Sequence, residues 1–306
     1  HNNTYGINFY RQGGSTGQTR HIQILSKTGA IQIIGDRGTL AAGGIGHSSW
    51  GDIYFGSPSN NSWLSTGNVV FTYSSLVGAT GNGFKVKTRG AVTYQPVGTS
   101  FASTQTFPHL SNYTVADSAS SLTIGKTGNT ADITIGANIS VAGPITISGG
   151  TITQNANITS TTASNITLNA NGGFYTGSTN VSVISTRMAI TSAGGNITIN
   201  ADIDANGSGV LNLDYLTINP GAGNTIIRGE SFNWSTVNDS HRPWINGTGS
   251  FTMESNDASF NANLHMIWFV LDQDNNGMGG LTLGKSTEVN SLLINHTTGN
   301  NQYSGP

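Results

Sequence analysis

The sequence lacks cysteine and has few charged residues. None of its 306 residues is Cys, which excludes disulfide bonds, thiolate metal sites and a cysteine nucleophile. Asp, Glu, Lys and Arg together make up 8% of the chain, against about 25% in typical soluble proteins. Serine, threonine and asparagine fill the places that lysine and glutamate usually occupy, so contact with water depends on uncharged hydroxyl and amide groups.

A strong charge of either sign is also missing. The 12 Lys and Arg residues are scattered along the chain, and with 14 Asp and Glu residues the formal net charge is −2. Such a small charge gives no field that would attract nucleic acid or an anionic membrane, and we expect no nucleic-acid partner. The longest apolar run, 266–271, is only as long as a strand, whereas a membrane-spanning helix needs about 20 apolar residues. We therefore expect no membrane span.

The stretch 131–169 shows the pattern that dominates the chain, which is short bursts of alternating β-branched residues. Isoleucine or valine alternates with threonine or serine, the bursts begin mostly six or seven residues apart, and glycines separate several of them. Period-two alternation places the apolar side chains on one face, and Thr, Asn, Ile and Gly are poor helix formers. We predict an all-β fold, a parallel β-helix (β-solenoid) with short outward loops and roughly 20 residues per turn. We expect a right-handed coil, although the pattern itself does not fix its hand.

The chain also repeats itself with a 159-residue period, which places Gly90 on Gly249 and aligns five separated blocks in one register. The blocks are GINFYRQGG with NITLNANGG, HIQILSKTGAI with NVSVISTRMAI, GAVTYQPVGTSF with GSFTMESNDASF, SLTIGK with GLTLGK, and Ile133–Ile135 with Leu292–Ile294. We predict two β-helix modules, residues 1–159 and 160–306, that belong to one continuous solenoid. Because no signal peptide precedes the first block, we expect a mature fragment or an excised piece of a longer array.

One loop resembles half of a calcium-binding motif. The sequence DQDNNG places Asp272, Asp274 and Asn276 at the oxygen-donating positions of a D-x-D-x-N-G loop, which suits a hard cation. The acid expected at position twelve is replaced by Leu283, and the loop 202–207 makes the same incomplete match. Calcium at Asp272, Asp274 and Asn276 is one hypothesis, and a polar turn after a strand is the other, because Asp, Asn and Gly are common turn residues.

Tryptophans in the last third suggest a second kind of site. Trp234 and Trp244 are candidates for stacking against sugar rings, although such residues also fill or cap the end of a solenoid. Catalysis is not expected. The acidic pairs lie in the two turn loops just described, the arginines are dispersed, and neither a nucleophile elbow nor a metal-binding histidine spacing is present.

The residues resemble a known family. The stretch TVADSASSLTIGKTGNTADITIGANISVAGPITISGGTITQNANITS, with NITLNANGG and AGGNITINADI, is similar to the repeat units of very large β-strand-repeat surface adhesins. These are the filamentous-haemagglutinin-like proteins, especially those of Bacteroidetes, including gliding adhesins of the SprB type. The resemblance covers most of the chain. It implies secretion to the bacterial cell surface by the type IX route and a role in attachment or gliding motility, with no catalytic residue. Apart from the calcium considered above, we expect no cofactor.

These observations predict a structural and adhesive segment of a long surface filament. Its partners would be neighbouring modules of the same chain and surface or glycan ligands, held by many weak contacts of the outward loops. The alternative is a β-helix that binds glycans or acts on them as a lyase or hydrolase. A groove lined by three or more acids, or by stacked tryptophans, would favour that alternative.

Overall fold

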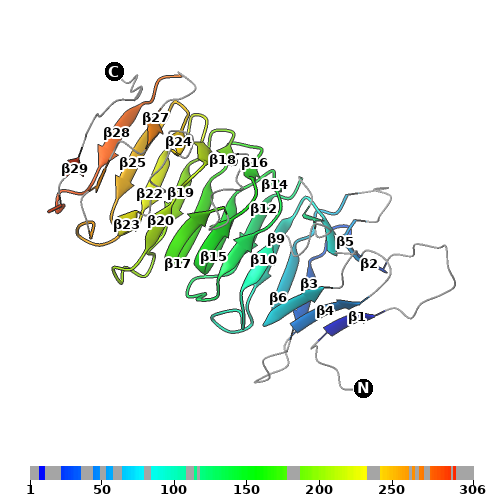
Figure 1. Ribbon diagram of the computed structural model, residues 1–306. Helices are drawn as coiled ribbons and strands as arrows, with labels where there is room; N and C mark the ends of the chain where they lie inside the picture. Colours follow the sequence, from blue (N-terminus) through cyan, green and yellow to red (C-terminus); the bar gives the residue numbers. More distant parts are fainter. Residues whose placement is uncertain are drawn as a thin grey trace. The chain divides into compact units, whose positions relative to one another are not determined.

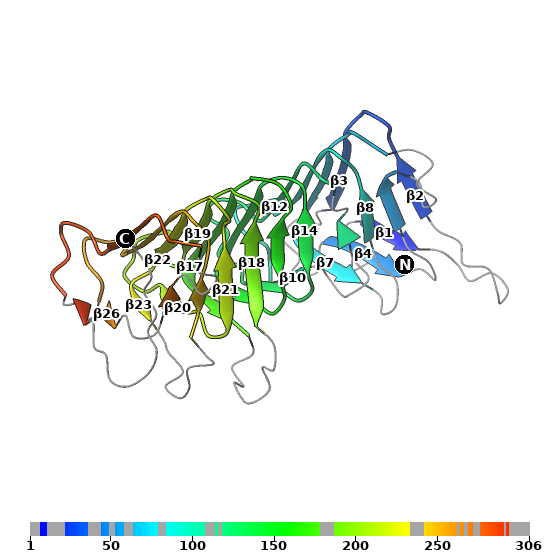
Figure 2. The ribbon, with the colours of Figure 1, turned by 90° about the horizontal axis from the view of Figure 1, so that it is seen from above.

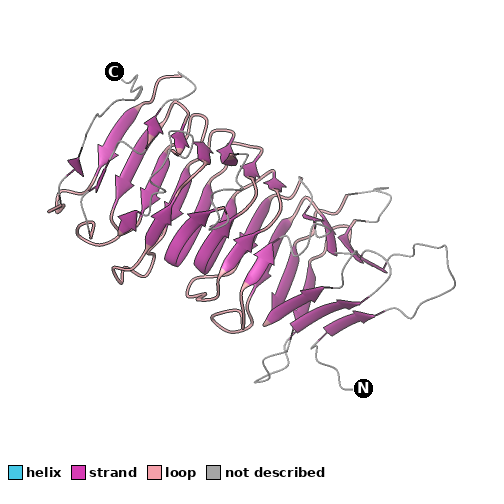
Figure 3. Ribbon diagram, in the orientation of Figure 1, coloured by secondary structure: helices cyan, strands magenta, loops and turns pink. Residues whose placement is uncertain are grey.

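A computed structural model gives the architecture of the chain. It describes residues 7–10, 22–35, 44–48, 53–57, 64–78, 84–107, 114–115, 118–177, 187–232, 242–261, 264–265, 269–271, 276–290 and 292–293. The chain divides into two compact units, His1–Gly149 and Gly150–Pro306, which are described separately. The described residues form strands, turns and loops without a helix (Figure 3), so none of them provides a helix able to cross a membrane.

The first unit is a coil of parallel strands (Figure 1). Its main sheet contains β3 (Ile31–Gly35), β6 (Val69–Tyr73), β9 (Ala91–Gln95), β12 (Ser121–Ile124) and the start of β15 (Ile145–Gln154). A second sheet contains β2 (Ile22–Leu25), β5 (Ile53–Gly56), β8 (Phe84–Lys87) and β11 (Thr114–Val115), and a third contains β1 (Ile7–Tyr10), β4 (Gly44–Ser48) and β7 (Ser75–Gly78). β10 (Gln105–Phe107) pairs with β13 (Ile133–Ile135), and β14 (Ile139–Val141) precedes β15.

The second unit is built in the same way. Its main sheet contains β17 (Ile166–Thr176), β19 (Ile197–Asn200), β22 (Thr225–Arg228), β25 (Ser250–Glu254) and β28 (Gly280–Leu283). Another sheet contains β16 (Ile158–Ser160), β18 (Met188–Ser192), β21 (Leu216–Asn219), β24 (Trp244–Ile245) and β27 (Val270–Leu271), and Figure 2 shows β18 beside β21. β20 (Val210–Asn212) pairs with β17 and β23 (Ser231–Phe232), and β26 (Leu264–His265) pairs with β29 (Leu292–Leu293).

Each unit is therefore a parallel β-helix, as the alternating pattern predicts. All the strand pairs given above are parallel, and each main-sheet strand pairs with the strand of the next turn.

Turn length differs from the expectation of about 20 residues. The turn from Val69 to its partner Val92 is close to that expectation. The turn from Ile31 to its partner Val69 contains more than one and a half times as many residues as the turn from Val69 to Val92. Each of these two turns contains three strands, so they differ in the number of residues that connect the strands.

Columns of stacked apolar side chains fill the interior of each coil. Register places the inward residues of one turn directly above those of the next, which gives the following columns. In the first unit they are Ile31, Val69, Val92, Leu122 and Ile145, and Ile33, Phe71, Tyr94, Ile124 and Ile147; in the second they are Ile166, Ile197, Thr225, Phe251 and Leu281, and Leu168, Ile199, Ile227, Met253 and Leu283. Burial of these columns is the main source of stability, as in other stacked repeats.

Asparagines outside the core join successive turns of the second unit. The Oδ1 atom of Asn165 accepts the backbone N–H of Asn196 at 2.9 Å, and the Oδ1 atom of Asn196 accepts that of Asn224 at 2.8 Å. Asn224 Oδ1 in turn accepts the N–H of Ser250 at 2.9 Å. Each asparagine stands immediately before a main-sheet strand, so the ladder satisfies a backbone donor at the entries to β19, β22 and β25.

Glycines lie where the backbones of successive turns come closest. A Cβ atom on Gly90 would lie 2.4 Å from the carbonyl oxygen of Gly67, and one on Gly67 would lie 2.0 Å from that of Gly29. In the second unit, a Cβ atom on Gly223 would lie 2.3 Å from the carbonyl oxygen of Gly195. Real Cβ atoms do not approach backbone so closely, so these corners admit only glycine. We call these residues the glycine column.

The sequence repeat is visible in the hydrogen-bond register of the later blocks. Ala91 pairs with Ser121, and their counterparts Ser250 and Gly280 also pair. Gln105 pairs with Ile133, as Leu264 pairs with Leu292. The two N-terminal blocks do not share this equivalence. β1 belongs to the three-stranded sheet, whereas its counterpart β17 belongs to the main sheet; β3 belongs to the main sheet, whereas its counterpart β18 does not. The module boundaries at 159 and 160 remain a prediction.

A buried threonine interrupts one apolar column and gives a stability prediction. Thr225 is 1% exposed between Ile197 and Phe251, and its hydroxyl has no hydrogen-bond partner. We expect Thr225→Val to raise the free energy of unfolding by about 1 kcal/mol, since the isosteric side chain removes an unsatisfied buried hydroxyl. Urea titration measures the change. Thr252→Val, on the outer face of the same sheet, is the control, and an equal gain there would contradict the explanation.

Candidate functional site

Three acidic side chains converge on one side of the second unit. Asp202 follows β19, Glu230 follows β22 and Asp257 follows β25, so consecutive turns contribute one residue each. One oxygen atom from each carboxylate lies within 4.8 Å of those of the other two. Asp202 and Glu230 are fully buried, and Asp257 is partly exposed. We call these three residues the acidic cluster.

Local turns hold the buried carboxylates in place. Asp202 accepts the backbone N–H groups of Asn206 at 3.2 Å and Gly207 at 3.0 Å. Glu230 accepts the hydroxyl of Ser255 at 2.7 Å and the backbone N–H of Asn256 at 2.9 Å. The carboxylates therefore organise the backbone of the loops that follow β19 and β25.

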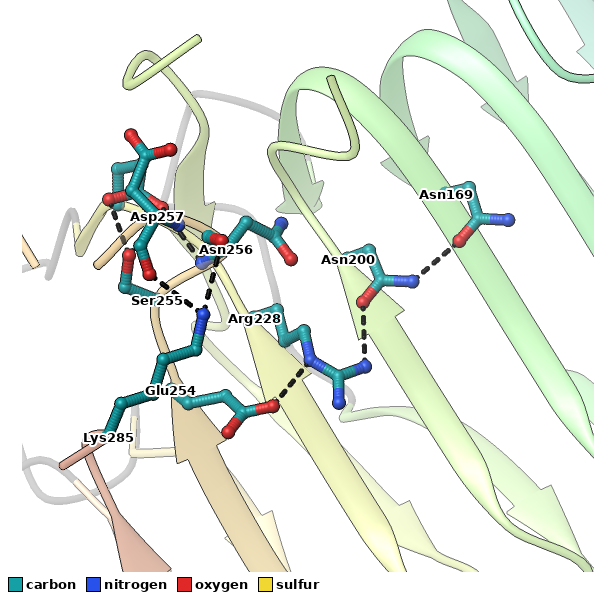
Figure 4. Close-up of polar contacts among 9 residues, drawn as sticks. Asn169, Asn200, Arg228, Glu254, Ser255, Asn256, Asp257 and Lys285 are labelled. Atoms are coloured by element: carbon teal, nitrogen blue, oxygen red, sulfur yellow. Dashed lines mark hydrogen bonds and ion pairs between the residues drawn. The ribbon is translucent and has the colours of Figure 1, made fainter. Parts of the chain in front are cut away.

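A lysine lies next to the last of these loops. Lys285 Nζ donates to the backbone carbonyl oxygens of Asn256 at 3.1 Å and Asp257 at 2.8 Å (Figure 4). Its charge is thus directed to the carbonyl groups of the segment whose N–H groups bind Glu230. Both the N–H groups and the carbonyl oxygens of this segment therefore have hydrogen-bond partners.

The acidic cluster places like charges close together in a buried site. Burial raises the pKa of Asp202, and the hydrogen bond with Asp204 and the charge of Glu230 raise it further. The backbone N–H groups of Asn206 and Gly207 act in the opposite direction. Carboxylate oxygens at this separation are the ligand type that a hard divalent cation takes. Because two of the three side chains are fully buried, the cluster offers little surface for acid–base chemistry on a polysaccharide.

The raised pKa of Asp202 predicts a pH-dependent stability difference. The ionised form is disfavoured in the folded state, so the penalty is present in full above the folded pKa and disappears below the unfolded pKa, about 3.9. We expect Asp202→Asn to be more stable than the wild type at neutral pH, and the difference to shrink as the pH falls toward 4. Thermal unfolding across this pH range measures it. Asp132→Asn, at an exposed site, is the control; a pH-independent difference for Asp202→Asn would contradict the assignment.

The calcium prediction falls largely outside what the structure covers. Asp272 and Asp274 lie outside the described residues, and Asn276 is an exposed turn residue. Calcium at this loop stays a prediction. The related loop 202–207 is described, and its acidic side chains form hydrogen bonds within the loop. Asp202 binds two backbone N–H groups of its own loop, and Asn206 Nδ2 donates to Asp204 Oδ2 at 2.9 Å. This geometry fits the polar-turn alternative.

The two tryptophans proposed for sugar stacking have different outcomes. Trp234 lies outside the described residues. Trp244 lies at the start of β24, partly exposed, with the guanidinium of Arg187 3.6 Å from the centre of its ring. Arg187 Nη1 also donates to the carbonyl oxygen of Arg242 at 2.7 Å, and burial lowers the pKa of Arg187 to about 10. That face of Trp244 is covered by a cation and is not open to a sugar. Glycan binding stays a prediction.

A polar row on the outer face of the second unit was not predicted from the sequence. Asn169, Asn200, Arg228 and Glu254 occupy equivalent positions on four adjacent strands (Figure 4). Asn200 Nδ2 donates to Asn169 Oδ1 at 2.6 Å, and Arg228 Nε donates to Glu254 Oε1 at 2.7 Å. Asn169, Asn200 and Glu254 each follow an apolar–polar–apolar burst, whereas Arg228 follows Thr-Ile-Ile, so the available sequence signal was incomplete. The contacts depend on the pairing register of neighbouring strands, which cannot be read from a local sequence pattern.

A second unpredicted feature is a polar loop that occurs in both units. Ser100 Oγ donates to Asn129 Oδ1 at 3.0 Å, and their counterparts in the second repeat, Ser259 and Glu288, form the same contact. Asn129 also accepts the backbone N–H of Phe101, as Glu288 accepts that of Phe260. These bonds to Ser259 and to backbone N–H groups lower the pKa of Glu288 despite its partial burial. A neutral amide and a carboxylate thus perform the same structural task.

Comparison with known proteins adds no relative. No protein-family model, curated protein or solved structure matches this chain.

Proposed function

We propose that the chain is a structural and adhesive segment of a large bacterial surface adhesin. It would be secreted by the type IX route, lie on the outside of the outer membrane and take part in attachment or gliding through many weak contacts. Neighbouring modules of the same long chain and surface or glycan ligands would be its partners. The proposal assigns no enzymatic activity.

The observation that carries this proposal is the register that the two sequence repeats share. In the first repeat Ala91 pairs with Ser121, and in the second the equivalent residues Ser250 and Gly280 pair in the same way. Two segments far apart in sequence thus form equivalent pairs of strands. Between the matched strands, the segments 102–120 and 261–279 have the same length and different side chains. A coil that keeps its register while the segments between the matched strands change is suited to presenting varied contact surfaces on a constant support.

Surface chemistry supports the same proposal. The described outer faces include pairs of uncharged threonines on neighbouring strands, such as Thr167 beside Thr198. Individual contacts from such groups are weak, so useful attachment requires many copies acting together. The two fully buried members of the acidic cluster are inaccessible to a polymeric substrate. Their hydrogen bonds to loop residues instead favour a structural role, which is to hold these loops.

A density series tests the proposal. Beads carrying increasing amounts of the chain are allowed to settle on glass and on glycan-coated surfaces, and the retained fraction is measured under flow. We expect retention to rise more steeply than surface density, because avidity grows with the number of simultaneous contacts. Heat-unfolded chain on identical beads is the control. Saturable binding of one soluble glycan with no density effect, or release of reducing sugar from a polysaccharide, would instead support the glycan-binding or carbohydrate-active alternative.

A further inference from the structure

Charge is divided unevenly between the two units. Residues 1–149 contain eight Lys and Arg against four Asp, whereas residues 150–306 contain four Lys and Arg against ten Asp and Glu. The formal net charge of −2 is therefore the difference between a positive first unit and a negative second unit. Among the described residues of the first unit, five are Lys or Arg and one, Asp132, is acidic. An anionic partner would accordingly be attracted to the first unit.

Three of these basic residues form a row on the outer face of β8. Burial alternates along the strand, so that Lys85 and Lys87 are partly exposed between buried neighbours. Thr88 continues the pairing through a parallel bridge with Ser65, and Arg89 after it is exposed. Outward residues two positions apart lie about 6.7 Å from each other along a strand, so the three cations extend over about 13 Å. We call Lys85, Lys87 and Arg89 the basic row.

The strands beside the basic row place uncharged residues next to it. Tyr54 on β5 and Thr114 on β11 flank Lys85, and Gly56 on β5 flanks Lys87. The Nζ atom of Lys87 lies 4.9 Å from the centre of the Tyr54 ring, and an aromatic ring orients an ammonium group without neutralising it. Burial and the charge of Lys85 lower the pKa of Lys87. The two ammonium groups thus repel each other, and an anion beside the row would offset this repulsion.

The second repeat lacks the basic row. At the same offset of 159 residues, the three positions are occupied by Trp244, Asn246 and Thr248. Both segments lead into a glycine, Gly90 or Gly249, whose added Cβ atom would meet the backbone of a neighbouring turn. The corner is therefore kept while the cations are not, which means that the coil itself does not require them. A difference confined to outward side chains is typical of a contact surface that belongs to one module.

The spacing of the cations favours a polymer whose negative charges are also widely spaced. Duplex DNA carries one negative charge per about 1.7 Å of its length, so cations about 6.7 Å apart would neutralise only a small part of the segment they touch. A polyuronate, in contrast, carries one carboxylate per sugar. In the second unit, Arg228 Nε donates to Glu254 Oε1 at 2.7 Å between outward positions of neighbouring strands. An outer face of this fold therefore accommodates a carboxylate beside a cation.

We propose that the basic row of the first unit binds a linear polyuronate, an acidic polysaccharide with one carboxylate per sugar. The inference rests on the proposed adhesive function, for which it names the class of ligand. Lys85, Lys87 and Arg89 each pair with a carboxylate of the polymer. Such pairs are individually weak at exposed sites, so firm retention requires several chains that hold the same polymer.

Neutralising the row tests the proposal. Binding of the chain to immobilised polygalacturonate is measured by surface plasmon resonance, with immobilised neutral dextran as the blank. We expect the triple variant Lys85→Gln, Lys87→Gln, Arg89→Gln to bind about tenfold more weakly than the wild type, since three exposed ion pairs are lost. Added salt should weaken wild-type binding more than that of the triple variant. Lys126→Gln, which removes a positive charge after β12, is the control matched to Lys87→Gln, and it should bind like the wild type.

The remaining outcomes separate this inference from the proposed function. Thermal melting verifies that each variant folds. Absence of wild-type binding to polygalacturonate, equal binding to dextran, unchanged binding of the triple variant, or an equal loss in Lys126→Gln would overturn the proposal. So would binding to duplex DNA or to phosphatidylglycerol vesicles that exceeds binding to polygalacturonate and disappears in the triple variant. If beads still adhere with a steep density effect but polygalacturonate does not bind, only this inference fails; loss of the density effect refutes the proposed function instead.

Discussion

Gly90→Ala is expected to destabilise the first unit by about 3 kcal/mol or more. The added methyl group would lie 2.4 Å from the carbonyl oxygen and 2.6 Å from the carbonyl carbon of Gly67, and 2.8 Å from the carbonyl oxygen of Thr66. All three are backbone atoms that cannot rotate away. Two turns would have to separate along the glycine column, which would break the hydrogen bonds of β6 with β9. Urea titration followed by circular dichroism measures the loss.

Gly98→Ala is the matched control for this substitution. Gly98 is exposed in the same unit, has no heavy atom within 4 Å of an added Cβ atom, and does not require a positive φ. We expect no loss and a gain of up to about 1 kcal/mol, because alanine restricts the unfolded chain more than glycine does. If both variants lost stability equally, the close approach of turns would not be the cause.

Phe71→Ala is expected to cost about 3–5 kcal/mol, as large-to-small changes at buried aromatic sites do. Phe71 is fully buried. Its ring centre lies 4.9 Å from that of Phe55 in an edge-to-face arrangement, 4.9 Å from that of Tyr94 and 5.9 Å from that of Phe84, the last two nearly parallel. Because these rings come from successive turns and two different sheets, removing the central one leaves a cavity that the others cannot close together. The free energy of unfolding is again the measured quantity.

Val70→Thr serves as the control for the aromatic site. Val70 is the neighbour of Phe71 on β6 and points outward, partly exposed. Threonine keeps the β-branched shape, so a change within about 0.5 kcal/mol is expected, as for surface substitutions generally. A loss as large as that of Phe71→Ala would mean that the strand itself, and not the aromatic interior, is sensitive.

The fold could be predicted because its cause is local and repeated. Alternation in segments such as Ile145–Ile147 identifies strands, and their close spacing excludes ordinary hairpins. Turn length could not be predicted in the same way. The segments that connect the strands between Ile31 and Val69 have no periodic pattern, so strand alternation does not predict how many residues they contain. The glycine column also escaped prediction, because Gly67 and Gly90 become neighbours only when the register is known.

The candidate site was less predictable than the fold, for the same physical reason. Asp202, Glu230 and Asp257 belong to three different turns and are far apart in sequence, and only the stacking of turns brings them together. A motif search finds Asp202 because of its own loop, and it gives no reason to connect that loop with Glu230. The equivalence of Asn129 and Glu288 was hidden because the two residue types differ, although both accept a backbone N–H group.

Unequal turns have a mechanical consequence. If the chain is pulled from its ends and turns peel away singly, each event releases the residues of one turn as extended polypeptide. At about 3.5 Å per residue, the turn from Val69 to Val92 adds roughly 80 Å of contour length, and the longer turn from Ile31 to Val69 adds roughly 130 Å. The force–extension trace would then carry an ordered series of step sizes, so that each step would identify the turn that had given way.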